Sequence, residues 1–149
     1  MSMLSVTVVQ EASGLDPVDN RARLRELVPC DSDLVVLPEA FARDFGEPGS
    51  DLTPYAEAVD GAFAAEVERV AALRGATVVA GMFEQTPDTP YNTVVVRGSA
   101  HLDYRKIHLY DSFGHQESKI LSAGTLEPVV VEVAGFRLGL LNCYDLRFP

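Results

Sequence analysis

Three side chains that could do chemistry together each follow a short apolar run of the chain. They are Glu39 after residues 34–38, Lys106 after residues 102–105 and Cys143 after residues 136–142. A thiolate is a strong nucleophile, and a carboxylate can take the proton from the thiol. An ammonium ion stabilises both the thiolate and the oxyanion of a carbonyl group under attack. The three residue types therefore suit nucleophilic attack on a carbonyl carbon.

Each of these residues also has a purely structural explanation. Glu39 could be an acidic residue at a helix start, and Lys106 a solvated charge. Cys143 taken alone is better explained as a small core residue that ends a strand. All three, however, stand where a predicted strand ends, and ligands of open α/β sheets bind outside the carboxyl ends of the strands. The shared placement predicts that the acid, the amine and the thiol converge.

The elements that must position these residues follow from the apolar periodicity and the turn residues. β-Branched and apolar runs predict buried strands at residues 4–9, 34–37 and 77–81. A helix is predicted over residues 18–28, after the capping pair Asp16-Pro17, and another over residues 61–74, before Gly75.

Two hairpins and a loop complete the predicted fold. Strands at residues 93–97 and 101–105 flank Gly98-Ser99, and strands at 129–133 and 136–141 flank Ala134-Gly135. Residues 108–125 have no clear period and are predicted to form a long functional loop. The order of elements predicts one α/β domain, or part of one, with a partly parallel sheet covered by helices.

The composition limits the class of partner and the compartment. A net charge of −10 on 149 residues disfavours nucleic acid and anionic membrane as partners. No apolar run reaches the roughly 18 residues that a membrane span needs, and no signal peptide is visible. Two cysteines make no disulfide framework. These features predict a soluble protein of the cytoplasm.

No metal or cofactor is predicted. His101, His108 and His115 recur at every seventh residue, but neither a strand nor an irregular loop has that period. No clustered ligands of the kind that hold a metal ion accompany them.

Three segments in register resemble the catalytic motifs of the nitrilase superfamily of carbon–nitrogen hydrolases. They are residues 37–41 (LPEAF), 104–111 (YRKIHLYD) and 142–149 (NCYDLRFP). Their order and spacing match the family, and the resemblance runs along the whole chain. It implies an αββα four-layer sandwich of the α/β class and a triad of Glu39, Lys106 and Cys143.

The resemblance also implies roles for further residues. Glu39 would take the thiol proton and Cys143 would attack an amide carbon, leaving a thioester that water hydrolyses. Lys106 and the backbone N–H of Tyr144 would hold the oxyanion, and Glu117 would orient Lys106. Tyr110 and Phe113 are candidates for the substrate pocket on their loop position alone.

The residues after the cysteine narrow the expected substrate. They are similar to those of amidase-type members that hydrolyse small ω-amides or deaminated glutathione. Nitrile hydrolases of the superfamily carry Trp-Glu there, and this chain has no Trp. The prediction is hydrolysis of a small-molecule amide to an acid and ammonia. The alternative within the superfamily is an N-carbamoyl amine hydrolase.

Members of the family are nearly twice as long as this chain, and family habit favours homodimers. Residues 1–149 are therefore expected to be the N-terminal portion of a single hydrolase domain without its C-terminal half. Such a product would expose sheet edges and apolar faces, and we expect it to be unstable or to aggregate without turning over an amide. A non-catalytic remnant or binding module is the alternative of a different class.

Overall fold

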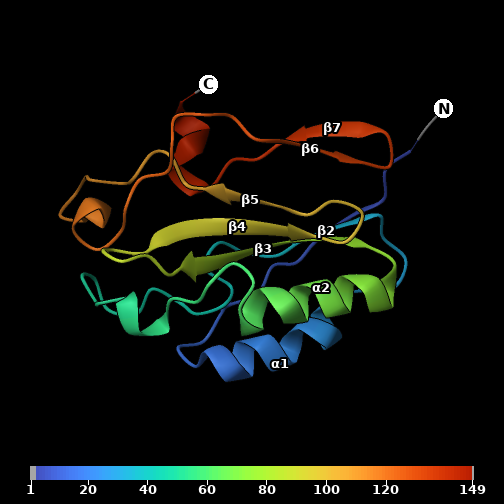
Figure 1. The fold of residues 1–149 in the computed structure, drawn as a ribbon, viewed down its shortest axis with the longest axis horizontal. Coiled ribbons are helices and arrows are strands. Elements are labelled where there is room, and N and C mark those ends of the chain that lie inside the picture. Colours follow the sequence, from blue (N-terminus) through green and yellow to red (C-terminus); the bar gives the residue numbers. More distant parts are fainter. Residues whose placement is uncertain (1–2, 149) are drawn as a thin grey trace.

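Two helices cover one face of a five-stranded sheet, and a two-stranded sheet lies against the other face (Figure 1). The structure is a computed structural model and describes residues 3–148. The main sheet contains β1 (Val6–Val8), β2 (Leu34–Val36), β3 (Thr77–Glu84), β4 (Tyr91–Arg97) and β5 (Leu102–Arg105). The second sheet contains β6 (Val130–Val133) and β7 (Phe136–Gly139). The helices are α1 (Pro17–Leu27) and α2 (Ala62–Arg74), and the short 3₁₀ turns are η1 (Thr53–Tyr55), η2 (Glu117–Lys119) and η3 (Cys143–Arg147).

Local sequence explains where both helices begin and end. The Asp16 side chain accepts a hydrogen bond from the N–H of Val18, and Pro17 occupies the first turn, where no N–H is needed. Helix α2 ends at Gly75, whose φ of 66° suits a residue without a side chain. The apolar faces of the two helices pack on the even-numbered residues of β3, including Val78 and Ala80.

The strand order brings several strand ends to one edge of the main sheet. The order is β1-β2-β3-β4-β5, with β1, β2 and β3 mutually parallel and β4 antiparallel to β3 and to β5. Strand β5 therefore runs in the same direction as β2 and β3. Because of this direction, the residues that follow β2 and β5 meet at the same edge, which is where Glu39 and Lys106 lie.

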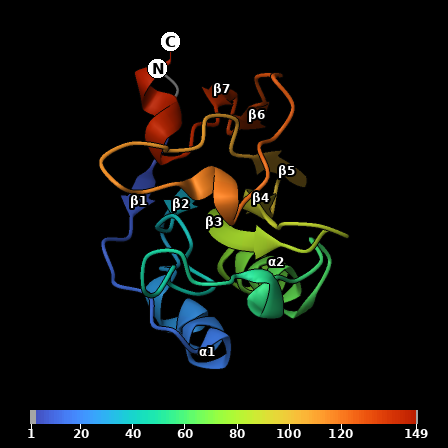
Figure 2. The same ribbon diagram turned by 90° about the vertical axis from the view of Figure 1, so that its left-hand side faces the viewer.

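The second sheet covers only part of the inner face of the main sheet (Figure 2). Val131 and Val133 of β6 pack with Val79 and Val94 in a buried apolar cluster. Val8 of β1 stands on the same face, because it pairs with Val36, yet it is 74% exposed. Among residues 3–148, strands β6 and β7 pair only with each other.

The predicted α/β class is confirmed, and residues 3–148 supply one helical layer and two sheets of the expected sandwich. The element ends differ from prediction mainly at β3 and β4. Strand β3 continues to Glu84 and β4 begins at Tyr91, because these residues pair with each other. The buried carboxylate of Glu84 accepts hydrogen bonds from Thr93 and Arg105, and no local pattern signals such partners.

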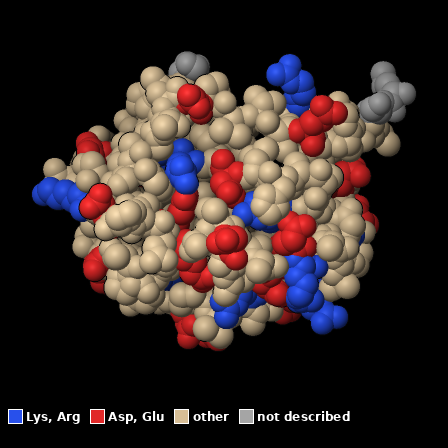
Figure 3. Space-filling model, in the orientation of Figure 1, with Lys and Arg blue, Asp and Glu red and all other residues tan. Residues whose placement is uncertain are grey.

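The surface agrees with the acidic composition. Figure 3 shows basic and acidic side chains interspersed over one face of the molecule. Within the described part of the chain, neither helix has the length and apolar character needed to cross a bilayer.

We predict that Gly81 is required for the turn that carries Glu39. A Cβ atom at Gly81 would lie 2.4 Å from the backbone nitrogen of Ala40 and 3.0 Å from the Cα of Glu39. Gly81→Ala is expected to lower the free energy of unfolding by about 1–3 kcal/mol, because backbone must move to make room. Urea denaturation measures this change.

Gly139→Ala in β7 is the matched control, since a Cβ there would meet no atom within 4 Å. This control is expected to change the free energy of unfolding by no more than about 0.5 kcal/mol. Equal stabilities of the two variants would contradict the predicted close approach at Gly81.

Candidate active site

The Lys106 side chain lies between two carboxylates that come from distant segments. Its Nζ atom is 3.2 Å from Oε1 of Glu39 and 3.0 and 2.9 Å from the two oxygens of Glu117. Glu39 follows β2, Lys106 follows β5, and Glu117 begins η2 in the loop after Lys106. One Glu117 oxygen also accepts a hydrogen bond from the backbone N–H of Tyr110, which fixes this carboxylate.

Burial does not deprive Lys106 of its charge. The residue is 1% exposed, and burial alone would lower the pKa of its ammonium group. The charges of Glu39 and Glu117 outweigh this effect and raise the pKa above its usual value. Lys106 is therefore a fixed positive charge, not the solvated surface lysine of the structural alternative.

Cys143 occupies a strained turn at the start of η3. Its φ of 51° is in the left-handed region, which costs a residue with a side chain about 1–3 kcal/mol. The residue is exposed, so it is not the core cysteine that its sequence position alone favoured. Loss of water around the thiol and the charge of Glu39 raise the pKa of Cys143, while Lys106 acts in the opposite direction. The thiol thus lies within the influence of both partners predicted for it.

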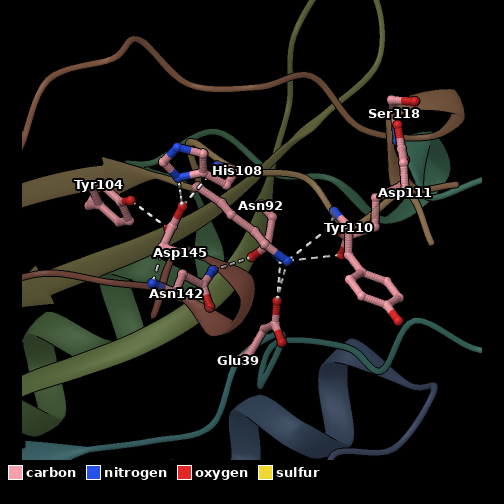
Figure 4. A network of polar contacts seen from close by, with 11 residues as sticks. Glu39, Asn92, Tyr104, His108, Tyr110, Asp111, Ser118, Asn142 and Asp145 are labelled. Atoms are coloured by element: carbon pink, nitrogen blue, oxygen red, sulfur yellow. Dashed lines mark hydrogen bonds and ion pairs between the residues drawn. The ribbon is translucent and has the colours of Figure 1, made fainter. Parts of the chain in front are cut away.

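A chain of two amides links Glu39 to the turn of the cysteine. Asn92 of β4 donates from Nδ2 to Oε1 of Glu39 at 2.7 Å, and Asn142 donates from Nδ2 to Oδ1 of Asn92 at 2.9 Å (Figure 4). Both amides are buried. Lys106 and Asn92 use the same oxygen of Glu39, which leaves Oε2 for the thiol.

A buried carboxylate lies on the other side of the cysteine turn. Asp145 accepts hydrogen bonds from Tyr104, from the backbone and ring of His108, and from the backbone N–H of Asn142 (Figure 4). Burial alone would raise the pKa of Asp145, but these hydrogen bonds lower it below its usual value. Burial and the neighbouring Asp145 raise the pKa of Tyr104.

Two cavities are lined by the carboxylates that contact Lys106. One, of about 460 Å³, lies between residues 45–49 and the loop 110–120 and is lined by Tyr110 and Glu117. The other, of about 590 Å³, lies between the two sheets and is lined by Glu39 and Cys143. Phe113 is 95% exposed and lines neither cavity, so the structure does not bring it to the site with Tyr110.

Tyr144, the residue predicted to supply a backbone N–H to the oxyanion, directly follows Cys143 in η3. As the second residue of η3, it comes too early in the turn for its N–H to reach a carbonyl of that turn. Its ring packs edge-on against that of Tyr110, with the centroids 5.0 Å apart.

Asn92, Asn142 and Asp145 were not predicted to belong to the site. Asn92 stands two residues before the apolar run 94–96, and a polar residue in such a strand is a weak signal of a buried amide. Asp145 stands two residues after the cysteine, which alone does not distinguish a buried carboxylate from a surface one. Asn142 and Asp145 bond to each other three residues apart, but their other partners and that of Asn92 lie at least 37 residues away in the sequence.

The chain belongs to the carbon–nitrogen hydrolase family, whose sequence profile matches residues 6–149. This finding confirms the family that the three motifs predicted. A hydrolase of Mycobacterium tuberculosis is 42% identical over 158 residues, which cover 98% of this chain and 54% of the hydrolase. The deaminated glutathione amidase of Escherichia coli O157:H7 is 37% identical over 124 residues, which cover 80% of this chain and 47% of the amidase.

A solved structure shares the fold along the whole chain. It is a CN-hydrolase superfamily protein from Xanthomonas campestris with an arsenic adduct in its active site. The TM-score is 0.86 and the identity 34%, and the match covers 100% of this chain and 56% of that protein. The present chain thus spans about half the length of the relatives it matches.

We predict that the Lys106 ammonium holds the site together. Lys106→Met would leave the carboxylates of Glu39 and Glu117 without the positive charge between them. The free energy of unfolding is expected to fall by about 3–5 kcal/mol. The double variant Lys106→Met/Glu117→Gln removes one of the two negative charges as well. Its free energy of unfolding should be about 1–2 kcal/mol higher than that of Lys106→Met. Chemical denaturation of the three proteins provides the comparison.

Lys119→Met serves as the control, because Lys119 is exposed. A change within about 0.5 kcal/mol is expected there. If Lys106→Met were as stable as the control, the buried ion cluster would not have the importance assigned to it.

Proposed function

We propose that this protein hydrolyses a small linear amide to a carboxylic acid and ammonia through a thioester at Cys143. The observation that carries the proposal is the Lys106 ammonium, buried between Glu39 and Glu117 next to the thiol. Family membership supports amide hydrolysis in general, and the geometry supports this particular route.

The first step is attack by sulfur on the amide carbon. The raised pKa keeps Cys143 protonated near neutral pH, so the thiol needs a base as the attack occurs. The free oxygen of Glu39 takes the proton while the S–C bond forms. Negative charge then develops on the carbonyl oxygen, where the Lys106 ammonium and the N–H of Tyr144 stabilise it.

The second half of the reaction uses the same carboxyl group in reverse. Protonated Glu39 gives its proton to the leaving nitrogen, the C–N bond breaks, and ammonia departs from a thioester. Glu39 then takes a proton from water as the water oxygen attacks the thioester carbon, and the thiolate leaves with that proton. Glu117 holds Lys106 in place throughout.

The substrate class is supported by the cavity and by one relative. The amidase of Escherichia coli O157:H7 is named for deaminated glutathione, an amide that carries carboxylates. The cavity of about 590 Å³ that Glu39 and Cys143 line has room for a small acyl group, and Tyr110 lines the neighbouring cavity beside Glu117. We therefore propose an amide of a small dicarboxylic acid or deaminated glutathione as substrate.

The test is ammonia release from such amides by the whole gene product, with any residues that its reading frame encodes beyond residue 149. Cys143→Ala is expected to reduce kcat by at least about 10⁴-fold, because it removes the nucleophile. Glu39→Gln removes the base and is expected to reduce kcat by about 10²–10⁴-fold. Added hydroxylamine should divert the thioester to a hydroxamate in the wild type alone.

Other outcomes distinguish the alternatives. Release of carbon dioxide, ammonia and an amine from N-carbamoyl amines, with amides left intact, would identify an N-carbamoyl amine hydrolase. Ammonia release that persists in Cys143→Ala would refute the proposed nucleophile. A folded protein that hydrolyses neither amides nor N-carbamoyl amines, and whose Cys143 resists alkylation, would indicate a binding module.

We also propose that the 149 residues are the N-terminal portion of one hydrolase domain. The chain spans about half the length of the relatives it matches. Within residues 3–148, Val8 is exposed on the inner face of the main sheet and β7 pairs only with β6, so further strands of the same domain would cover the face and pair with the edge.

Translation of the reading frame past residue 149 is the direct check, and a stop codon there would contradict the proposal. Val8→Lys provides the physical test. In the whole gene product, a change in the free energy of unfolding below about 0.5 kcal/mol would show that the side chain is in water and would contradict the proposal. In a longer product that covers this face the substitution should cost about 2–4 kcal/mol, since a charge would be buried.

A further inference from the structure

A buried ionised group in the turn of the cysteine has no role in the proposed mechanism. Asp145 is 1% exposed, and its lowered pKa keeps the carboxylate charged. Oδ2 accepts hydrogen bonds from the Tyr104 hydroxyl and, at 3.1 Å, from the N–H of Asn142. Oδ1 accepts from the N–H of His108 at 2.8 Å and pairs with Nδ1 of the same residue at 2.9 Å. With two partners on each oxygen, Asp145 has no free site for a substrate.

The four contacts join two segments of the chain. Tyr104 and His108 stand two residues before and two residues after Lys106, and Asn142 immediately precedes Cys143. The carboxylate therefore ties the segment that carries Lys106 to the turn that carries Cys143. The ring of His108 also stacks on Phe148, at the end of that turn, with the centroids 3.9 Å apart and the planes at 5°.

The two proposed oxyanion donors come from these same two segments. The ammonium of Lys106 belongs to the first, and the backbone N–H of Tyr144 belongs to the second. Their spacing depends on how the segments are held, and the left-handed φ of 51° at Cys143 must be imposed by contacts of this kind. Asp145 is the side chain that bonds to both segments.

We propose that Asp145 is a positioning residue that sets the spacing between the Lys106 ammonium and the Tyr144 N–H. It thereby controls the stabilisation of charge on the carbonyl oxygen, and not the reactivity of the thiol. The inference rests on the proposed function, because the two donors have a common task only in that reaction. It assigns no contact between Asp145 and the substrate.

The experiment measures the reactivity of the thiol and the stabilisation of the oxyanion separately. It uses the whole gene product with Cys30→Ser, which makes Cys143 the only thiol of residues 1–149. Iodoacetamide alkylates the thiol without forming an oxyanion. A small aliphatic aldehyde instead adds to it reversibly: the S–C bond forms, the carbonyl π bond breaks, and the carbonyl oxygen takes up the thiol proton. The product is a thiohemiacetal whose oxygen occupies the oxyanion position.

Asp145→Asn preserves the size of the side chain but replaces one acceptor oxygen with an NH₂ group. The aldehyde Kd is expected to rise about 10–100-fold and kcat to fall about 100-fold, as for a displaced oxyanion donor. The alkylation rate should stay within about threefold, because the thiol and its charged neighbours Glu39 and Lys106 remain. A parallel loss of alkylation and aldehyde binding would overturn the proposal, as would no change in either.

Tyr104→Phe provides a second, milder variant in case Asp145→Asn does not fold. It removes one donor from Oδ2 and leaves the links to His108 and Asn142. An aldehyde Kd raised about 3–10-fold with unchanged alkylation is expected, and an unchanged Kd would overturn the proposal.

The failure of the proposed function looks different from these results. If the wild type binds the aldehyde at Cys143 but releases no ammonia from any amide, the proposed amidase reaction is wrong. The aldehyde Kd of the Asp145 variant still measures whether Asp145 positions the two donors. Cys143→Ala, which forms no adduct, sets the background for both readouts.

Discussion

The contacts of the Lys106 ammonium with two carboxylates are the interaction on which the arrangement of the site depends. A buried ammonium group loses its water and must be compensated by charges and hydrogen bonds from the protein. Glu39 lies 67 residues away in the sequence and Glu117 only 11 residues away. One ion therefore holds together the turn after β2, the end of β5 and the loop that contains η2. The pairing depends on β2 and β5 running in the same direction, because only then do both strands end at the same edge of the sheet.

The central strands of the main sheet contribute to the site through groups that do not react. At Gly81, β3 presents bare backbone, and the turn of Glu39 lies directly on it. At Asn92, β4 presents an amide that joins Glu39 to Asn142. The reactive side chains stand on turns, but their positions are set by the two strands with the longest pairing, β3 and β4. This division explains how a strained turn such as that of Cys143 persists.

Much of this arrangement could be predicted from the sequence because its causes are local. The caps of α1 and α2 and the hairpin turns at residues 98–99 and 134–135 depend on neighbouring residues. A general rule on strand ends predicted that Glu39 and Lys106 converge at one edge of the main sheet. Cys143 instead follows β7 of the second sheet, and its place beside them was implied by the family resemblance. The length of β3 could not be predicted, since Met82 to Glu84 become strand only by pairing with β4. Likewise, nothing near Lys106 or Asp145 in the sequence reveals that each is buried with charged or polar partners.

The burial of Lys106 has a practical consequence for covalent labelling. The chain contains two lysines, Lys106 and Lys119. The first has a side chain with no exposed area, whereas the second is exposed and lines the cavity beside Glu117. Of these two lysines, amine-reactive dyes or supports will therefore couple to Lys119 and spare Lys106. A fluorophore attached there would sit at the mouth of the cavity, where its emission can report when a molecule enters.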